Sequence, residues 1–324
     1  LEFEILKRGL PWKGINRNLQ KKTTPKNKLK HVVEEEFLYD LIQEDNYPDI
    51  LEINNATIKK FDKYLKSNPN NFKALNNKGY VLLILEKTDD AIECFEKALD
   101  INVDDFHAWF NKGVAYLKHE NYYDAKKCFL KFLNLNEDIP TLFKDNISNY
   151  FYDLGWSLYE NEKYQDSIHC YDISIGFNPE VPNYLNCKAI SLENLKMFDE
   201  ALDFYSKALE IEPNDDVIQD NKKNCYHNKI LDLGKNEDFA GAIECCNNAL
   251  NEFPNEPHFY NFYAISLAYL GRFDEALDYY SKALEIDPHD DVLKDNKLNC
   301  YCDKIADLGK NEDFAGAIEC CNNA

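Results

Sequence analysis

The chain contains 324 residues, of which 44% are hydrophobic and 29% are charged, so it can bury a sizeable core. Its 58 Asp and Glu residues against 37 Lys and Arg give a formal net charge of −21, which argues against nucleic-acid binding because it repels phosphate. No apolar run approaches the roughly 20 residues that span a bilayer, so we expect no membrane segment. Eleven cysteines, an odd number, favour a reducing compartment, and we expect a cytoplasmic protein.

Residues 1–30 differ in charge from the rest of the chain. They contain nine Lys or Arg residues against Glu2 and Glu4, a net charge of +7. The opening LEFEILKRGLPWKGI lacks the short apolar block and the small-residue cleavage site of a secretory signal. Because the cations are dispersed, we interpret this segment as a basic tail or linker. The alternative is a tether to an anionic membrane or a nucleic acid.

Residues 31–71 are predicted to form an incomplete helical unit. Their start, HVVEEEFLYDLIQ, has apolar residues at helical spacing. Phe61, Tyr64 and Pro69 then match, in type and spacing, residues near the end of the repeated units that follow. We therefore expect a degenerate leading or capping repeat in this segment.

From residue 72 onward the chain is built from internal repeats. The segment FDEALDFYSKALEIEPNDDVIQDNKKNCY from Phe198 recurs almost unchanged from Phe273, an offset of 75 residues, and LGKNEDFAGAIECCNNA recurs at the same offset. A shorter period lies within this duplication, because one position, small in most units, recurs after 34, 41 or 42 residues. The period divides the chain into seven units: 72–105, 106–139, 148–181, 182–215, 223–256, 257–290 and, truncated, 298–324.

Each unit is predicted to form two helices. Positions are counted here from the first residue of a unit, so Gly79 and Gly113 stand at position 8 of the first two. Large apolar residues at positions 11 and 24 alternate with small ones at positions 8, 20 and 27, and spacings of three, four and seven mark one face of a helix. Proline follows the second helix in four units, where its missing N–H and fixed φ stop helix propagation.

Departures from the period predict local changes in packing. Eight extra residues precede the third unit and seven precede the fifth and the seventh, which adds about two helical turns, so we expect longer first helices there. Ile230 and Ile305 replace the small residue at position 8, and Phe132 replaces the one at position 27. We expect the helices of those units to pack at a wider spacing or with a tilt. The last unit ends at Ala324 within its second helix, so we expect further chain beyond it.

The repeats resemble the tetratricopeptide repeat, a helix–turn–helix unit of 34 residues. The resemblance covers residues 72–324 and includes the family's large residue at position 4, which is Leu75, Trp109, Phe151, Leu185, Tyr226, Tyr260 and Tyr301. It implies an all-α fold, a right-handed α-solenoid of stacked helix–turn–helix repeats. It also implies that positions 2, 5, 9, 12 and 13 of the first helices line a concave groove. These positions supply the candidate partner-binding residues Tyr80, His107, Phe110, Val114, Tyr152, Trp156, Tyr159, Ile190, His227, Asn261 and Tyr269.

No sequence motif predicts catalysis or cofactor binding. Cysteine recurs at position 23 of five units, yet neither CxxC nor HExxH occurs. A small, half-buried apolar side chain is therefore a better interpretation of these cysteines than a metal or redox ladder. The glycine patterns that bind phosphates and dinucleotides are absent, as is GxSxG. We expect a protein that is not an enzyme and that uses no metal and no cofactor.

The favoured function is a protein–protein interaction scaffold that binds peptide or helical segments of partner proteins in its groove. Tyr152, Trp156 and Tyr159 form the densest aromatic cluster among the candidates, and aromatic side chains supply contact area at low rotamer cost. The alternative for each candidate is burial between repeats. Net acidity favours basic or neutral protein partners. A second interpretation is that the chain is a regulatory or substrate-positioning arm of an enzyme whose catalytic domain lies outside residues 1–324.

Overall fold

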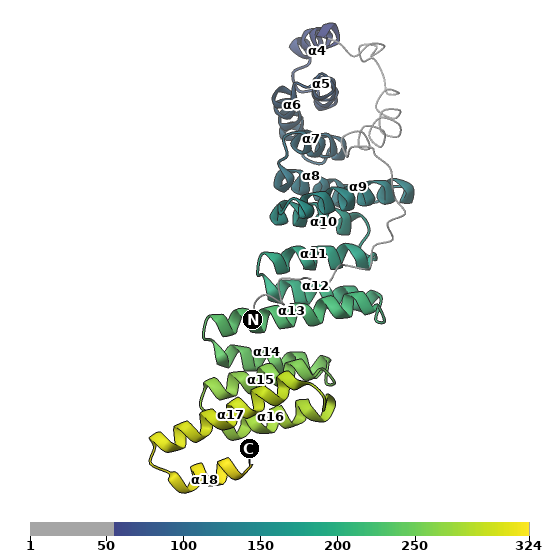
Figure 1. Ribbon diagram of the computed structural model, residues 1–324. Helices are drawn as coiled ribbons and strands as arrows, with labels where there is room; N and C mark the ends of the chain where they lie inside the picture. The colour runs from purple at the N-terminus through teal and green to yellow at the C-terminus, as the bar shows by residue number, and fades with distance from the viewer. Residues whose placement is uncertain (1–54, 324) are drawn as a thin grey trace. The chain divides into compact units, whose positions relative to one another are not determined.

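The computed structural model describes residues 55–323, and these residues form fifteen α-helices without any strand (Figure 1). The predicted all-α fold of repeated helices is confirmed for this part of the chain. The expectations for residues 1–30, and for the beginning of the leading repeat 31–71, lie outside the described residues. The chain divides after Leu195 into two compact units, which are described separately.

The first unit is a succession of helices that lie side by side in chain order (Figure 1). Its helices are α4 (Asn55–Ser67), α5 (Phe72–Ile84), α6 (Thr88–Ile101), α7 (Phe106–Lys118), α8 (Tyr122–Leu135), α9 (Thr141–Glu160), α10 (Tyr164–Phe177) and α11 (Pro182–Asn194). Close packing joins helices that are neighbours or next neighbours in the chain, such as α5 with α6, α6 with α7, and α8 with α10. The apolar core therefore extends along the row of helices, and one continuous cluster reaches from Leu82 to Phe177.

The second unit follows the same principle. Its helices are α12 (Phe198–Ile211), α13 (Asp216–Lys235), α14 (Phe239–Glu252), α15 (Pro257–Tyr269), α16 (Phe273–Ile286), α17 (Asp291–Lys310) and α18 (Phe314–Asn323). Each helix packs on the next one, and α13 and α15 also touch, as do α15 and α17. The boundary between the two units falls between α11 and α12, so the helices of the predicted repeat 182–215 belong to different units.

The predicted lengthening of three first helices is confirmed. Helices α9, α13 and α17 each have 20 residues, whereas α5, α7, α11 and α15 each have 13. In α13 the added turns begin at a side-chain cap, because the carboxylate of Asp215 accepts hydrogen bonds from the backbone N–H groups of Val217 and Ile218. Asp290 caps α17 in the same way. The inserted residues therefore extend helices and do not form loops.

The turn that follows each first helix has the same backbone conformation in every repeat. Position 15 has a positive φ throughout, 60° at Glu86 and 74° at Gly271, for example. This left-handed residue lets the next N–H turn back onto the helix, as in the 2.9 Å hydrogen bond from Lys87 N to Leu82 O. A left-handed conformation costs a residue with a Cβ about 1–2 kcal/mol, so five glutamates and one lysine carry this strain. The sequence gave no signal for this turn because glycine occupies the position only once.

Within a hairpin, a large side chain on the second helix fills the space left by a small residue on the first. A Cβ at Gly79 would lie 2.6 Å from Cε1 of Phe95, and a Cβ at Gly155 would lie 2.8 Å from Cε1 of Tyr171. Both rings are fully buried. Position 8 must therefore be small wherever position 24 carries an aromatic ring, and this pairing sets how closely the two helices approach.

The replacement of the small residue at Ile230 is offset on the facing helix. Position 24 of the same repeat is Cys246, and both side chains are buried, with 2% and 0% of their surface exposed. The large residue has moved to the first helix and the small one to the second, which conserves the total volume. Ile305 and Cys321 repeat the exchange. The expectation of wider spacing in these repeats overlooked this compensation.

The bulky residue at position 27 of the second repeat is also accommodated. The ring of Phe132 lies 5.1 Å from the ring of Phe110 and 6.3 Å from that of Phe143. Phe143 belongs to the extra turns of α9 and is buried. The insertion before the third repeat and the large residue at Phe132 are therefore parts of one aromatic cluster.

The size pairing can be tested by rebuilding the exchange elsewhere. We expect Gly155→Ile to lower the free energy of unfolding by about 1–3 kcal/mol, because its Cβ would collide with the ring of Tyr171. The double variant Gly155→Ile/Tyr171→Cys reproduces the Ile230 and Cys246 pair and should recover part of that loss. Denaturant unfolding measures both effects.

The matched control is Gly234→Ile in α13, where a Cβ would have no atom within 4 Å. This variant should not lose the stability that the crowded position loses. Equal losses at both glycines, or no recovery in the double variant, would contradict the size pairing.

Candidate functional site

The candidate partner-binding residues lie on first helices of both units. The first unit holds Tyr80 on α5, His107, Phe110 and Val114 on α7, Tyr152, Trp156 and Tyr159 on α9, and Ile190 on α11; the second holds His227 on α13, and Asn261 and Tyr269 on α15. Their exposure varies widely, so the structure separates residues that a partner can reach from residues that build the core.

Two of the candidates belong to the core, and the expectation that they line a groove is wrong. Phe110 has no exposed surface, and its ring lies 5.4 Å from that of Phe129 and 5.8 Å from that of Phe143. Val114 exposes only 5% of its surface and joins the same cluster. The extra turns of α9 supply Phe143, which covers this part of α7.

Two further candidates are buried and serve chiefly in packing. Tyr80 exposes 9% of its surface. Asn261 is also buried, and its side-chain oxygen accepts a 3.1 Å hydrogen bond from Nδ2 of Asn296 on α17. A similar amide pair joins α5 and α7, where Nδ2 of Asn111 donates to the side-chain oxygen of Asn76 at 3.0 Å. These bonds satisfy buried amides and align consecutive first helices.

The aromatic cluster on α9 is the most accessible group of predicted residues in the first unit. The rings of Trp156 and Tyr159 stack with centroids 5.4 Å apart, and Tyr164, the first residue of α10, lies 5.4 Å from Tyr159. All three side chains are partly exposed. From α11, Nδ2 of Asn194 donates a 3.3 Å hydrogen bond to the hydroxyl oxygen of Tyr159. Tyr164 and Asn194 were not predicted from the sequence, because they lie outside the five groove positions.

Tyr152 forms the base of this cluster. Its hydroxyl accepts a 3.8 Å hydrogen bond from Sγ of Cys187, and its ring lies 5.2 Å from the ring of Tyr184. Both partners belong to α11, so Tyr152 packs α9 against α11 as well as reaching the surface. Burial raises the pKa of Tyr152, and burial also raises the pKa of Tyr159, so both remain neutral phenols that donate and accept hydrogen bonds.

The other reachable candidates are more scattered. His107 and Ile190 are half-buried in the first unit. In the second unit, the ring of His227 lies 4.7 Å from that of Phe262, and its Nε2 is buried without a hydrogen-bond partner among the described residues. Burial, followed by the nearby His258, lowers the pKa of His227, which is therefore neutral at neutral pH. Tyr269 is 70% exposed, although one face of its ring stacks on Phe239.

A set of pairs that was not predicted links each second helix to the first helix of the next repeat. Position 25 of one repeat meets position 7 of the next, and the pair is ionic in three places of the first unit. These ion pairs are Asp62 with Lys78 at 2.7 Å, Glu96 with Lys112 at 3.0 Å, and Asp172 with Lys188 at 2.5 Å. The signal was present in the sequence as an acid and a lysine at fixed positions of consecutive units.

Where the charges are missing, both members of the pair change together. Positions 25 and 7 are Leu130 and Leu154 between the second and third repeats. In the second unit they are Asn247 and Tyr263, and Nδ2 of Asn247 donates to the tyrosine hydroxyl at 3.3 Å. Each combination is chemically complementary, so these pairs favour one register between neighbouring repeats.

The described residues offer no chemistry for a metal or a reactive thiol. No group of three or more His, Cys, Asp and Glu side chains between residues 55 and 321 is placed to share a metal ion. Nine of the eleven cysteines are buried and all are unpaired. Burial raises the pKa of Cys128 to about 12 and that of Cys245 to about 11, which keeps these thiols protonated. None of the helices from Asn55 to Asn323 has the length and apolar character that crossing a bilayer requires.

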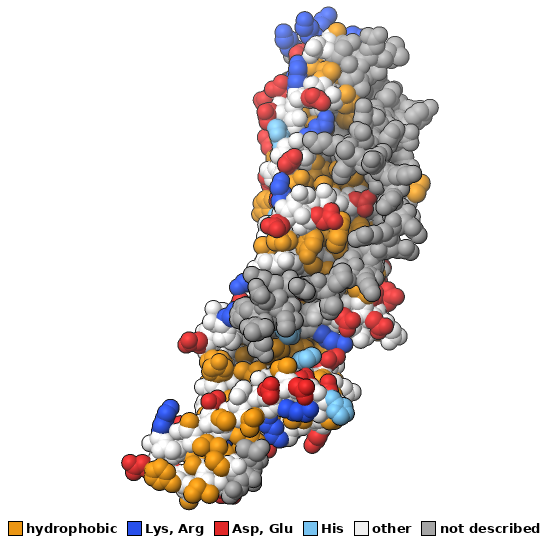
Figure 2. Space-filling view, in the orientation of Figure 1, with side chains coloured by type: hydrophobic (Ala, Val, Ile, Leu, Met, Phe, Trp, Pro, Cys, Tyr) orange, Lys and Arg blue, Asp and Glu red, His pale blue; other side chains and the backbone are white. Residues whose placement is uncertain are grey.

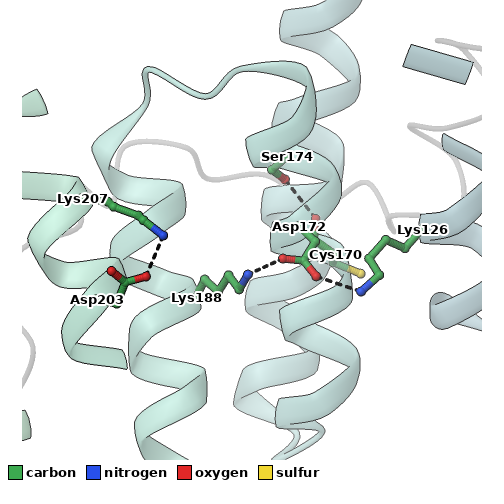
Figure 3. Close-up of polar contacts among 7 residues, drawn as sticks. All are labelled: Lys126, Cys170, Asp172, Ser174, Lys188, Asp203 and Lys207. Carbon is green, nitrogen blue, oxygen red and sulfur yellow. Dashed lines mark hydrogen bonds and ion pairs between the residues drawn. The ribbon is translucent and has the colours of Figure 1, made fainter. Parts of the chain in front are cut away.

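Asp172 is the centre of the most buried of these ionic contacts (Figure 3). Its carboxylate contacts Lys126 of α8 at 3.0 Å and Lys188 of α11 at 2.5 Å, and all three side chains are at most one-fifth exposed. We expect Asp172→Asn to lower the free energy of unfolding by about 1–3 kcal/mol, because two half-buried ammonium groups lose their counter-charge.

The control is the other ion pair drawn in Figure 3. Asp203 and Lys207 are four residues apart on α12 and are about half exposed, so Asp203→Asn should cost less than about 0.5 kcal/mol. Urea unfolding of the two variants compares the sites directly. Similar losses at Asp172 and Asp203 would show that the ionic contact between repeats contributes nothing special.

The repeated hairpins agree with a known family at the level of sequence. The family model described as tetratricopeptide repeat matches residues 72–105, 182–215 and 264–290, and a second model with the same description matches residues 106–139. The chain belongs to the tetratricopeptide repeat family.

Solved structures of similar sequence are distant relatives. A MamA protein is 20% identical, with 58% of this chain and 92% of that chain covered and a TM-score of 0.32. YrrB, described as a tetratricopeptide repeat protein with an unusual peptide-binding site, is 18% identical over 74% of this chain and 97% of its own, with a TM-score of 0.28. A tetratricopeptide repeat protein from Parabacteroides merdae is 15% identical over 85% of this chain and 99% of its own, with a TM-score of 0.32.

Proposed function

We propose that this chain is a scaffold whose first-helix surface binds peptide or helical segments of partner proteins. Tetratricopeptide repeats are protein-interaction modules, and their presence supports the general part of this proposal. The particular binding surface that we propose is the aromatic cluster on α9, together with the side chains of α10 and α11 that border it.

The observation that carries this proposal is the stack of Trp156, Tyr159 and Tyr164. These three rings are partly exposed and lie within 5.4 Å of their neighbours, so they present a rigid aromatic surface at little cost in rotamer entropy. Asn194 is bound to Tyr159 and is itself exposed, which places an amide beside the rings. An apolar side chain can pack on such rings while the amide bonds the backbone of the bound segment.

The charge of the chain indicates which segments fit best. The net charge of −21 favours a basic or neutral segment. The faces of Trp and Tyr also attract lysine and arginine side chains through cation–π contacts. We therefore propose partners that present a cationic or apolar side chain to Trp156. His107, Ile190, His227 and Tyr269 remain proposed secondary contacts, each within its own unit.

The proposed organisation is that of seven repeats with the boundaries predicted from the period. Helices α5, α7, α11 and α15 begin at the first residues of four of these units, which supports the division. The tetratricopeptide repeat is typical of non-catalytic interaction modules, and we propose no enzymatic role for the described residues. A cytoplasmic location stays part of the proposal.

The proposal predicts that binding depends on Trp156. Peptides of 16 residues selected from a display library on the intact chain provide the probes. We expect Trp156→Ala to weaken the selected peptides at least about fivefold, or about 1 kcal/mol, because the truncation removes the central ring of the stack. Fluorescence anisotropy with labelled peptides measures the change.

The control is Tyr123→Ala. Tyr123 is an aromatic residue with half of its surface exposed, but it lies on α8, a second helix. Its replacement should leave the same peptides bound with unchanged affinity. Selected peptides that bind the Trp156→Ala variant as tightly as the parent chain would overturn the proposed surface.

A further inference from the structure

The 75-residue duplication supplies an internal template for the last described helices. Helix α18 has the sequence FAGAIECCNN, which is identical to the first ten residues of α14. In the first copy, α15 covers the outer face of α14. The ring of Phe239 stacks on Tyr269 with centroids 4.5 Å apart and an interplanar angle of 3°, and Ile243 packs against the cluster that contains Ala264 and Leu267.

The second copy of this face is uncovered within the described residues. Phe314 and Ile318 are the counterparts of Phe239 and Ile243, and each exposes 65% of its surface. Figure 2 shows hydrophobic side chains gathered over the C-terminal helices, which are yellow in Figure 1. Two large apolar side chains one helical turn apart thus form an exposed stripe that, in the identical copy, is a helix-packing surface.

The differences between the two copies concern the same face. Of the 52 aligned residues in 198–249 and 273–324, nine differ, and six of these lie on α13 and α17. Lys223 pairs with Glu256 at the start of α15 at 3.0 Å, and its counterpart is Leu298, which is half exposed. His227 packs on Phe262 of α15, and its counterpart is Cys302.

These substitutions make the uncovered copy less polar than the covered one. A face that stays in water is expected to become more polar than its buried counterpart, because terminal repeats need a polar outer surface for solubility. Here a lysine has become leucine and a histidine has become cysteine, although both positions are exposed. The direction of change fits a face that is in contact with another apolar surface.

We propose that α17 and α18 bind an amphipathic helix of a partner protein through Leu298, Phe314 and Ile318. The helix lies where α15 lies on α13 and α14, and it carries an apolar residue at the place of Glu256. Its polar side is neutral or basic, because residues 291–323 contain seven carboxylates against four lysines. The same acidity disfavours a second copy of this chain as the occupant.

A peptide derived from α15 provides the probe. It spans residues 254–270, has two added lysines at each end, and is made with Glu256 or with leucine in its place. We expect the leucine version to bind the intact chain at least threefold more tightly than the Glu256 version, because the side chain now meets Leu298. We expect Phe314→Asp to weaken both peptides at least tenfold, as measured by isothermal titration calorimetry.

The Leu298→Lys variant separates recognition from folding. It restores the residue that pairs with Glu256 in the first copy, so it should reverse the preference in favour of the Glu256 peptide. A local loss of structure cannot produce such a reversal. Leu142→Lys, which changes an equally exposed leucine on α9, should leave both affinities unchanged, and Trp156→Ala should do the same because this face is independent of the proposed peptide-binding surface.

Three outcomes would overturn the proposal. The first is that neither peptide binds the intact chain, and the second is that binding persists in Phe314→Asp. The third is a concentration-dependent dimer in analytical ultracentrifugation that Phe314→Asp abolishes and the peptides do not displace, which would identify a second copy as the occupant.

Discussion

The structure depends on the fit of one large and one small side chain across each helix hairpin. Phe95 occupies the space that Gly79 leaves free, and Tyr171 does the same opposite Gly155, so neither position can change size alone. Ile230 with Cys246 shows that the rule concerns the sum of the two volumes and not the identity of either residue. The fit brings two helices close enough to bury their facing sides, and the remaining apolar surface is left for the next hairpin.

Contacts between hairpins then determine how each repeat is aligned with its neighbour. The pair formed by positions 25 and 7 is ionic at Asp172 and Lys188, whereas an amide and a phenol meet at Asn247 and Tyr263. These different chemistries serve the same purpose, because each pair involves only two consecutive repeats. The proposed binding surface is built on this alignment: Tyr159 on α9 has its correct setting only when Asn194 of α11 is in place.

Much of the fold was predictable because the determining interactions are local in sequence. The period alone gave the paired helices, and the inserted residues gave the 20-residue length of α9, α13 and α17. The left-handed turn at Glu86 was not predictable from composition, since a glutamate there carries a conformation that usually selects glycine. The exchange between Ile230 and Cys246 was missed because each position was interpreted without its partner.

The candidate site was less predictable than the fold, since exposure depends on side chains contributed by other repeats. Phe110 stands at a groove position, yet Phe143 from the lengthened α9 covers it. Trp156 and Tyr159 occupy equivalent positions and remain accessible because no inserted turn reaches them. Position in the repeat thus predicts on which helix a residue lies, whereas the neighbouring repeats determine whether it is exposed.

The central claim is that stability is passed between neighbouring helices and does not come from a common core. Native-state hydrogen exchange of the intact chain tests it most directly, with the opening free energy resolved for each helix. Stacking through neighbour contacts predicts a graded profile, in which amides of α10, packed against α8, α9 and α11, exchange slowest and those of α18, packed against α17, exchange fastest. A single opening free energy shared by all helices from α4 to α18 would contradict it.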